Sequence, residues 1–416
     1  MIRATYHVET PCPITEVAAM MAGEQSAGTF VRVEGETDEL RARFGARVIA
    51  TEQIGDSPGP SLRSAWAERK GLDGPRGVFR VVIEYPEDNV GVNLPTLASV
   101  VAGNLYDLGE VTGLKLMDVT LTPAYRARYD LPTQGIDGTR ASLGVQDRPL
   151  FGTIIKPNIG LAPDQIAALV MRMAKAGADF IKDDEIAGTH PHAPVDARIR
   201  AVMDVVRRHQ DETGKLVMVA FNITDETDAM RRHADLIEAE GGSCAMVSLN
   251  WCGLSGVQTL RRHTGLAIHG HRNGYGGMGR HPLLGIGVRA YQTLYRLAGI
   301  DHMHVHGMRG KFSDLDEDVT DAARHCLTPM EGDDRVMPVF SSGQWAGTLP
   351  YTLDRIGSDD LMFLCGGGIM AHPEGPAAGL ASLHQAHEAV RLGMPLDQAA
   401  RDRPELAQAL ATFSKA

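Results

Sequence analysis

The chain from residue 150 onward repeats one pattern, in which a short apolar run is followed by a longer segment of helical periodicity. Eight runs follow one another: LFGTIIKP, DFIKDDE, LVMVAFNIT, CAMVSLN, LAIHGHRN, HMHVHG, VMPVFSSG and MFLCGGG. Segments such as PDQIAALVMRMAKAG, PVDARIRAVMDVVRRHQ and LLGIGVRAYQTLYRLAG separate them. Continuous apolar strands that alternate with helices are typical of a parallel sheet, and eight units predict a closed (β/α)8 TIM barrel. A doubly wound open sheet is the alternative.

The first part of the chain lacks this repeat. Strand-like stretches are IRATYHVE, GTFVRVEG, GVFRVVIEYP and GLKLMDVTLT, and helical stretches are ITEVAAMMAGEQ and NLPTLASVVAGNLY. This order predicts a ferredoxin-like α+β domain with an antiparallel sheet. We therefore expect two domains in the 416 residues: an N-terminal α+β domain at 1–125, and a barrel with a C-terminal helix at 126–416.

The overall charge and the cysteines limit the classes of partner. A net charge of −11 argues against binding to a nucleic-acid backbone, which needs clustered Lys and Arg. The five cysteines are scattered and form no C-x-x-C pair, so we expect reduced thiols. The chain begins without a signal or transit sequence and contains no apolar run of about 18 residues. We expect a cytoplasmic protein that neither binds nor spans a membrane.

Polar residues stand at the carboxyl end of most predicted barrel strands, where barrels carry their active sites. They are Lys156, Lys182 to Glu185, Asn222, His269 and His271, His304 and His306, Ser341 to Gly343, and Gly366 to Gly368. Packing alone gives no reason for polar residues at the same end of nearly every strand. The pattern predicts a functional site there.

The second run contains the sequence FIKDDE. The strand period of two puts Lys182 and Asp184 on one face and turns Asp183 away, while Glu185 can bend toward the first pair. Two carboxylates and a lysine whose neutral amine combines with CO2 make an all-oxygen site suited to Mg²⁺. A salt-bridge cluster at a strand end is the alternative.

Three further motifs have two interpretations each. The pairs His269/His271 and His302/His304 suggest a zinc hydrolase of the amidohydrolase type, but the lysine and the pairs come in the wrong strand order, and each histidine can equally serve packing. GYGGMG at 274–279 fits a dinucleotide fingerprint, although the RHP that follows favours a flexible loop at the barrel mouth. SSG and CGGG expose backbone N–H groups where barrels hold phosphate, or else merely permit tight turns.

Taken in this order, the motifs resemble the large subunit of ribulose-bisphosphate carboxylase (RuBisCO) over nearly the whole chain. The resemblance implies a carbamylated Lys182 that binds Mg²⁺ with Asp184 and Glu185, with CO2 as the activator. It implies catalytic roles for Lys156 in GTIIKPNIGL, His271 in HGHR and the mobile-loop Lys311. Substrate contacts are implied for Glu24, Thr29, Asn104, Asn158, Arg272, His304, Ser341, Gly343, Gly367 and Gly368.

Departures from the carboxylase pattern point to a RuBisCO-like protein of the form IV type. Asn158 replaces a lysine, Phe30 replaces a tryptophan, H-V-H-G replaces H-S-G-T, and Ser342-Gly343 replaces a glycine pair. The residues for enolisation remain, whereas several that orient a bisphosphate and an added CO2 do not. The resemblance also implies a homodimer with an active site shared between subunits, and higher oligomers of dimers.

RuBisCO-like activities implied by the resemblance act on small phosphorylated substrates. Because Lys311 is retained and would handle a carboxylate or CO2, we favour 3-oxo-isoapionate 4-phosphate decarboxylation or carboxyl transfer with hydrolysis. A methionine-salvage enolase or isomerase that acts on a methylthio-sugar phosphate is the first alternative. A true carboxylase is another alternative, as is a nonenzymatic relative, against which the intact Lys182, Asp184 and Glu185 argue.

Overall fold

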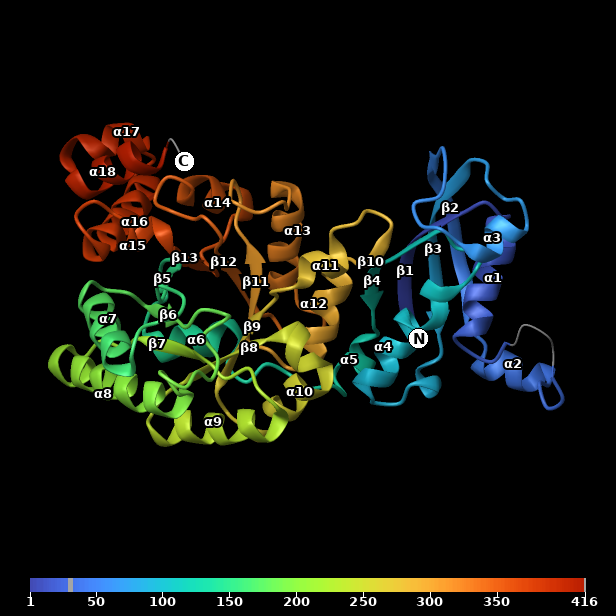
Figure 1. The fold of residues 1–416 in the computed structure, drawn as a ribbon, viewed down its shortest axis with the longest axis horizontal. Coiled ribbons are helices and arrows are strands. Elements are labelled where there is room, and N and C mark those ends of the chain that lie inside the picture. The colour runs from blue at the N-terminus through green and yellow to red at the C-terminus, as the bar shows by residue number, and fades with distance from the viewer. Residues whose placement is uncertain (29–32, 415–416) are drawn as a thin grey trace. The chain divides into compact units, whose positions relative to one another are not determined.

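The computed structural model describes residues 1–28 and 33–414, and the chain forms two compact units (Figure 1). The first unit holds residues 1–130 and 274–298, and the second holds 131–273 and 299–416. A single boundary after residue 125 was expected from the sequence. In these units the chain passes from the first to the second at 130/131 and returns for the segment 274–298.

The first unit is built on a five-stranded sheet in the order β10-β4-β1-β3-β2. Its strands are β1 (Ile2–Thr10), β2 (Arg47–Ser57), β3 (Arg76–Tyr85), β4 (Gly113–Thr120) and β10 (Leu284–Ile286). Strand β1 pairs antiparallel with both β3 and β4, and β2 pairs antiparallel with β3. This is the predicted ferredoxin-like sheet, to which β10 adds a parallel strand beside β4.

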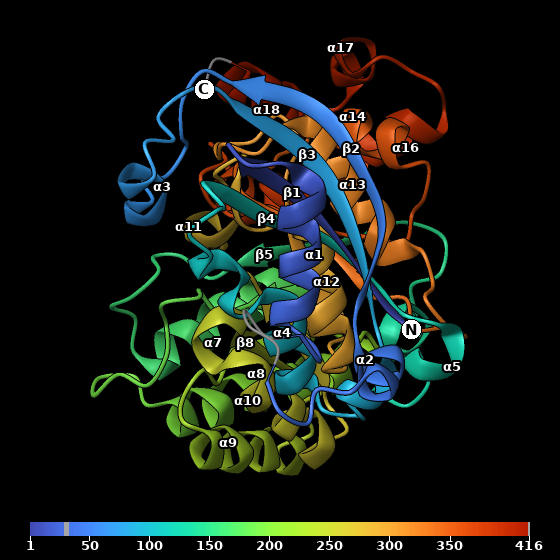
Figure 2. The ribbon, with the colours of Figure 1, turned by 90° about the vertical axis from the view of Figure 1, so that its right-hand side faces the viewer.

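The sheet carries its helices because its strands alternate in burial. Ile2, Ala4, Tyr6 and Val8 of β1 are fully buried while the side chains between them are more exposed, as the period of two requires. Helix α1 (Ile14–Glu24) lies along one face of the sheet (Figure 2). Tyr6 donates a hydrogen bond of 2.8 Å to a carbonyl of α4 (Leu94–Ala102), tying that helix to the sheet.

Several elements of this unit differ from the predictions. Strand β2 was missed because it is an edge strand whose side chains are almost all exposed, so its sequence shows no apolar alternation. Of the strand predicted at 28–35, residues 29–32 lie outside the described part of the chain, and the residues on either side are not strand.

Two predictions at 274–299 were also wrong. The helix predicted from residue 283 starts later, because 284–286 form β10 and α12 spans Val288–Leu297. The GYGGMG segment contains a short helix, α11 (Tyr275–Gly279), instead of a loop. The first unit further contains α2 (Asp38–Phe44), α3 (Ala65–Arg69) and α5 (Pro123–Arg126).

The second unit is a closed barrel of eight parallel strands, which excludes the open sheet. Its strands are β5 (Leu150–Ile154), β6 (Phe180–Lys182), β7 (Met218–Asn222), β8 (Cys244–Ser248), β9 (Ala267–His271), β11 (His302–His306), β12 (Met337–Phe340) and β13 (Met362–Leu364). Every one of the eight predicted runs contains one of these strands.

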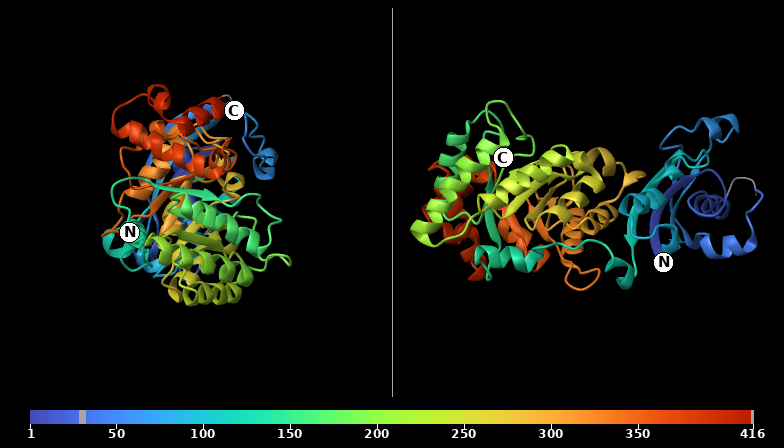
Figure 3. Two further views of the ribbon diagram at one scale, coloured as in Figure 1. Left: turned by 90° about the vertical axis from the view of Figure 1, so that its left-hand side faces the viewer. Right: turned by 90° about the horizontal axis from the view of Figure 1, so that it is seen from below.

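Helices surround the barrel, and α7 to α10 (green to yellow) lie outside the strands (Figure 3). The helices are α6 (Gly135–Leu143), α7 (Pro163–Lys175), α8 (Val195–Thr213), α9 (Thr227–Ala239), α10 (Leu249–His263), α13 (Asp316–Leu327), α14 (Leu349–Ile356), α15 (Gly367–Met370), α16 (Pro376–Arg391), α17 (Leu396–Ala399) and α18 (Pro404–Phe413). Within residues 1–28 and 33–414, no helix is long and apolar enough to cross a lipid bilayer.

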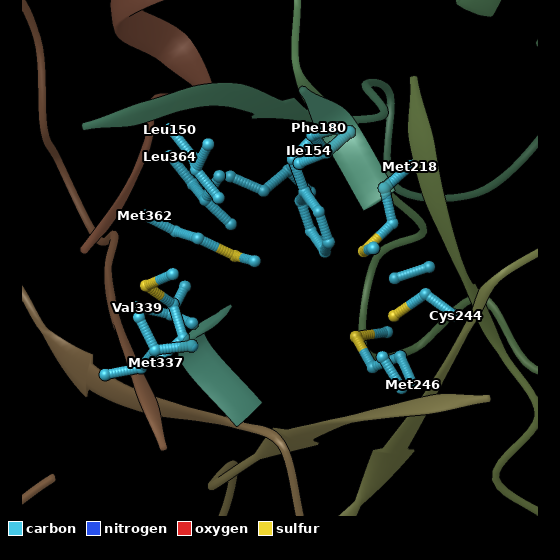
Figure 4. Close-up of a cluster of buried hydrophobic side chains, with 14 residues drawn as sticks. Leu150, Ile154, Phe180, Met218, Cys244, Met246, Met337, Val339, Met362 and Leu364 are labelled. Carbon is cyan, nitrogen blue, oxygen red and sulfur yellow. The ribbon is translucent and has the colours of Figure 1, made fainter. Parts of the chain in front are cut away.

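The barrel interior is apolar on one side and contains histidines on the other. Buried residues of β5 to β8, β12 and β13 form an apolar cluster together with Ala267 of β9 and with Ile136 and Leu143 of α6 (Figure 4). Strands β9 and β11 instead supply His269, His302 and His304, each at most 1% exposed. Buried polar side chains persist only where they are hydrogen-bonded, so these histidines need partners inside the barrel.

Candidate active site

The turn after β6 gathers the lysine and the carboxylates. Lys182 ends the strand with its side chain 1% exposed, and its Nζ lies 2.8 Å from the carbonyl oxygen of Asp183 and 3.6 Å from Oε2 of Glu185. Burial lowers the pKa of Lys182, against the charge of Glu185, which raises it. The lowered pKa favours the neutral amine, which is the form that reacts with CO2.

Adjacent aspartates in this turn face different partners. Asp183 binds Nε of Arg198 at 3.0 Å and accepts a hydrogen bond of 3.0 Å from the backbone N–H of Asn222. Asp184 pairs with Nζ of Lys156 at 2.6 Å. Asp183 therefore holds the turn to helix α8, while Asp184 points toward the end of β5.

The side chain of Asn222, at the end of β7, fixes the position of this turn. Its Nδ2 donates to the carbonyl oxygens of Asp184 (3.1 Å) and Glu185 (3.0 Å), and its Oδ1 accepts from the hydroxyl of Thr224 at 2.7 Å. The sequence marked Asn222 as a polar strand end without assigning it a role. Its contacts make it the support for the backbone that carries both carboxylates.

On the opposite side of the barrel mouth, His271 approaches the same carboxylate. Its Nε2 lies 3.5 Å from Oε2 of Glu185. Burial lowers the pKa of His271 well below its ordinary value, so the imidazole is neutral. Lys182, Glu185 and His271 thus converge on one point.

Asp314 joins two residues of the mouth that the sequence did not connect. Its carboxylate accepts from Nη2 of Arg272 at 3.0 Å and lies 2.8 Å from Nδ1 of His306. Burial raises the pKa of Asp314, but the hydrogen bond with His306 and the charge of Arg272 outweigh burial and lower the pKa to about 2. His306 has a φ of 67°, which is uncommon for a residue with a side chain and frequent at functional sites.

The seventh and eighth strands end in exposed backbone. Ser342 and Gly343 both have positive φ, at 70° and 86°. Helix α15 begins at Gly367, and a side chain at Gly367 would meet nothing within 4 Å. Lys156 reaches the same place, because a side chain at Gly366 would come within 3.5 Å of its Cε.

The remaining predicted residues lie in three places. Asn158 accepts a hydrogen bond of 2.7 Å from Nζ of Lys156. Lys311 is exposed on the loop between β11 and α13, where its backbone N–H donates to the carbonyl of Ser342 at 3.2 Å. Glu24 and Asn104 belong to the first unit, where both are exposed and Glu24 lines a cavity of about 780 Å³. Thr29 lies outside the described residues.

The donor set at the mouth fits Mg²⁺ only with the lysine included. In the part of the chain that the structure describes, no group of three His, Cys, Asp or Glu side chains is arranged to hold a metal ion. Asp184 and Glu185 supply two carboxylates beside the amine of Lys182, and conversion of that amine to a carbamate would supply the third oxygen donor. The residues present therefore fit a hard divalent cation on that condition.

A ferredoxin-like unit, a closed barrel and a lysine–carboxylate turn at the strand ends define the class: an α/β-barrel protein whose functional groups gather at one end of the strands. Residues 2–125 match the N-terminal domain of the ribulose bisphosphate carboxylase large chain, and residues 135–413 match its catalytic domain. The chain belongs to this family and is a RuBisCO-like protein.

Similar proteins span the full chain. It is 44% identical over 413 residues to the 3-oxo-isoapionate-4-phosphate transcarboxylase/hydrolase of Xanthobacter autotrophicus, covering 98% of each chain. It is 40% identical over 416 residues to the 3-oxo-isoapionate-4-phosphate decarboxylase of Rhizobium rhizogenes, covering 99% of this chain and 98% of the other. The crystal structure of a rubisco-like protein from Burkholderia fungorum is 53% identical, with a TM-score of 0.94 and 99% of both chains covered.

Proposed function

We propose that the chain is a Mg²⁺-dependent, enolate-forming enzyme whose substrate is 3-oxo-isoapionate 4-phosphate. Two full-length relatives carry this compound in their names. The observation that carries the proposal is the turn at 182–185, where a buried lysine of lowered pKa stands beside two carboxylates. Such a turn suits lysine carbamylation and a hard cation.

In this proposal Lys182, as its carbamate, holds Mg²⁺ together with Asp184 and Glu185. When bound, Mg²⁺ supplies positive charge that stabilises a developing oxyanion on the substrate. Asn222 keeps the two carboxylates in place through the backbone of the turn. Burial lowers the pKa of Lys182, which favours the neutral amine needed for the carbamate.

The reaction class follows from the chemistry of a 3-oxo acid. Its carboxylate lies one carbon away from a ketone, so the bond to the carboxylate can break with its electron pair passing into the ketone. CO2 leaves, an enolate forms, and its carbon then takes up a proton. Hydrolytic cleavage after carboxyl transfer consumes water in addition.

We assign these steps to three side chains of the mouth. Lys156, hydrogen-bonded to Asp184 and Asn158, donates the proton to the enolate carbon. Lys311 is exposed on its loop and offers an ammonium group to the substrate carboxylate. The neutral imidazole of His271 accepts a hydroxyl proton. Phosphate is held by the backbone at Gly343, Gly367 and Gly368, of which Gly343 and Gly367 are exposed.

A methylthio substrate would need an apolar lining at the mouth. Met308, the methionine of the loop after β11, is fully buried and its sulfur accepts a hydrogen bond from Thr320 at 3.9 Å. Met308 is therefore committed to the protein core. Met308 therefore does not supply that lining, whereas Trp345 is only partly buried.

We also propose a homodimer with a shared active site. The family resemblance assigns substrate contacts to Glu24, Thr29 and Asn104 of the partner subunit's first unit, and Glu24 and Asn104 are exposed as this role requires. Sedimentation of the purified protein tests the assembly, because a monomer that turns over the substrate would contradict it.

The function is tested with purified protein, Mg²⁺ and bicarbonate. We expect consumption of 3-oxo-isoapionate 4-phosphate that stops when Mg²⁺ is chelated. Lys182→Ala abolishes turnover, whereas Lys175→Ala, at an exposed lysine on α7, leaves it intact. Inactivity toward this compound together with rapid conversion of a methylthio-ribulose phosphate, or with fixation of labelled CO2 into ribulose bisphosphate, would overturn the proposal.

A further inference from the structure

A continuous line of hydrogen bonds runs through the barrel interior to the active site. Nε2 of His302 lies 2.8 Å from the hydroxyl of Thr139 in α6, and Nδ1 of His302 lies 3.2 Å from Nδ1 of His269. Nε2 of His269 lies 2.7 Å from Nε2 of His304, and Nδ1 of His304 lies 3.1 Å from the hydroxyl of Ser341. All five residues are buried, with Ser341 the most accessible at 6%.

Thr139, at the end of this line farthest from the active site, determines which atom donates in each hydrogen bond. The hydroxyl of Thr139 donates its single proton to the carbonyl oxygen of Gly135 at 2.6 Å, so it can only accept from His302. A neutral imidazole carries one N–H, and that of His302 is thereby placed on Nε2. His269 must then donate from Nδ1 to His302, and His304 must donate from Nε2 to His269.

The resulting order of donors and acceptors ends at Ser341. With its proton on Nε2, His304 presents a lone pair at Nδ1, and the hydroxyl of Ser341 donates to it. Three neutral imidazoles and one hydroxyl carry one proton each, which is the number that the four hydrogen bonds from Thr139 to Ser341 require. If one of the imidazoles carried a second proton, two N–H groups would face each other at one of these contacts.

The interior keeps these imidazoles neutral. Burial lowers the pKa of His302 to about 3 and lowers the pKa of His269 and of His304 well below the ordinary value. Phe180 stacks on His269 with ring centres 5.0 Å apart, which excludes water from the middle of the line.

We propose that Thr139, through His302, His269 and His304, fixes the hydroxyl of Ser341 as a hydrogen-bond acceptor toward the substrate. Thr139 is thus a positioning residue that acts on specificity from the far end of the barrel interior. The inference rests on the proposed function in one respect, namely that Ser341 contacts the substrate.

The consequence is a chemical preference at one subsite. Because the proton of Ser341 is committed to His304, only its lone pairs remain for a further partner, and the hydroxyl of Ser342 lies 3.4 Å away. A substrate hydroxyl, which can donate, is favoured there, and a group that only accepts is disfavoured. The lost hydrogen bond corresponds to about tenfold in affinity.

The direction of the line is tested first without any ligand. Protein with ¹⁵N-labelled histidine is studied by long-range ¹H–¹⁵N NMR, which distinguishes the two neutral tautomers. We expect His302 and His304 protonated at Nε2 and His269 at Nδ1 in the wild type and in Thr139→Ser. In Thr139→Val, which cannot accept, all three should change tautomer. A wild-type His304 protonated at Nδ1 would overturn the proposal whatever the substrate proves to be.

The preference is tested with substrate analogues in which each hydroxyl of 3-oxo-isoapionate 4-phosphate is replaced in turn by fluorine. We expect one analogue to bind about tenfold more weakly than its parent to the wild type and to Thr139→Ser, and this penalty to shrink to about twofold or less in Thr139→Val. An unchanged penalty in Thr139→Val refutes the positioning role. If no compound of the series binds, the proposed substrate is wrong, and the NMR result alone decides the direction of the line.

Discussion

Replacement of Asp183 by asparagine tests whether the adjacent aspartates of the turn have separate roles. The Asp183 and Arg198 side chains are 2% and 1% exposed and pair at 3.0 Å. Burial raises the pKa of Asp183, against the charge of Arg198, which lowers it. Asp183→Asn therefore leaves a buried guanidinium without its counter-charge.

The cost of this change follows from the remaining partners of Arg198. Loss of one partner of a buried ion pair costs about 3–5 kcal/mol. Arg198 still donates to the carbonyls of Ala187 (2.9 Å), Ala193 (3.0 Å) and Gly188 (3.3 Å), so we expect the lower end, about 3 kcal/mol. For a domain of this size about 2 °C is lost per kcal/mol, so the melting temperature should fall by about 6 °C.

Calorimetry and the Mg²⁺-dependent assay together give the test, with Asp184→Asn as the matched variant. Lys156, the partner of Asp184, is 33% exposed, so loss of this ion pair in Asp184→Asn should cost about 1 kcal/mol or less of stability. Turnover of Asp184→Asn should be abolished. Asp183→Asn should melt early and retain Mg²⁺-dependent turnover at low temperature. The reverse outcome, an unchanged melting temperature with lost turnover in Asp183→Asn and retained turnover in Asp184→Asn, would refute the assignment of the two side chains.

Two further predictions concern the mouth. Because the pKa of Asp314 lies at about 2, below its unfolded value of about 3.9, its carboxylate stabilises the fold above about pH 4 and loses this effect as the pH falls toward 2. The melting temperatures of wild type and Asp314→Asn should converge over that interval, and a constant difference would contradict the role of the His306 contact. Gly367→Ala should raise KM for the phosphorylated substrate at an unchanged melting temperature, because its Cβ meets no protein atom within 4 Å. Gly368→Ala should lower the melting temperature as well, because its Cβ would collide with the carbonyl of Gln344. An unaltered KM in Gly367→Ala would mean that the phosphate does not bind at this turn.

The barrel could be predicted from the sequence because its strands are buried on both faces. Each run therefore reads as continuous apolar residues, and the helices between them keep their own period. Strand β2 could not be found in this way, because an exposed edge strand needs no apolar face. Strand β10 has only three residues, and they stand next to a strongly periodic helix.

The active site, too, could be predicted only in part, because some of its contacts join neighbours in the sequence and others join distant residues. Lys182, Asp184 and Glu185 are neighbours in the sequence, so strand parity was enough to bring them together as candidates. The contacts of Asp314 with Arg272 and of Thr139 with His302 join residues 42 and 163 positions apart. The helix and strand periodicity of the sequence carries no information about such distant pairs. An acidic residue soon after Lys311 was the available signal for Asp314.

The charges at the mouth explain how the site can be stable before substrate binds. Lys156 pairs with Asp184 at 2.6 Å, Lys182 lies 3.6 Å from Glu185, and Arg272 pairs with Asp314 at 3.0 Å. A cation bound by Asp184 competes with Lys156 for the same carboxylate, so binding of the cation frees the Lys156 ammonium for the substrate. Arg272 stays neutralised by Asp314, a carboxylate outside the proposed ligand set. In the proposed function Lys156 is then free to give its proton to the enolate carbon, while the exposed Lys311 faces the substrate carboxylate and the backbone at Gly343 and Gly367 faces the phosphate.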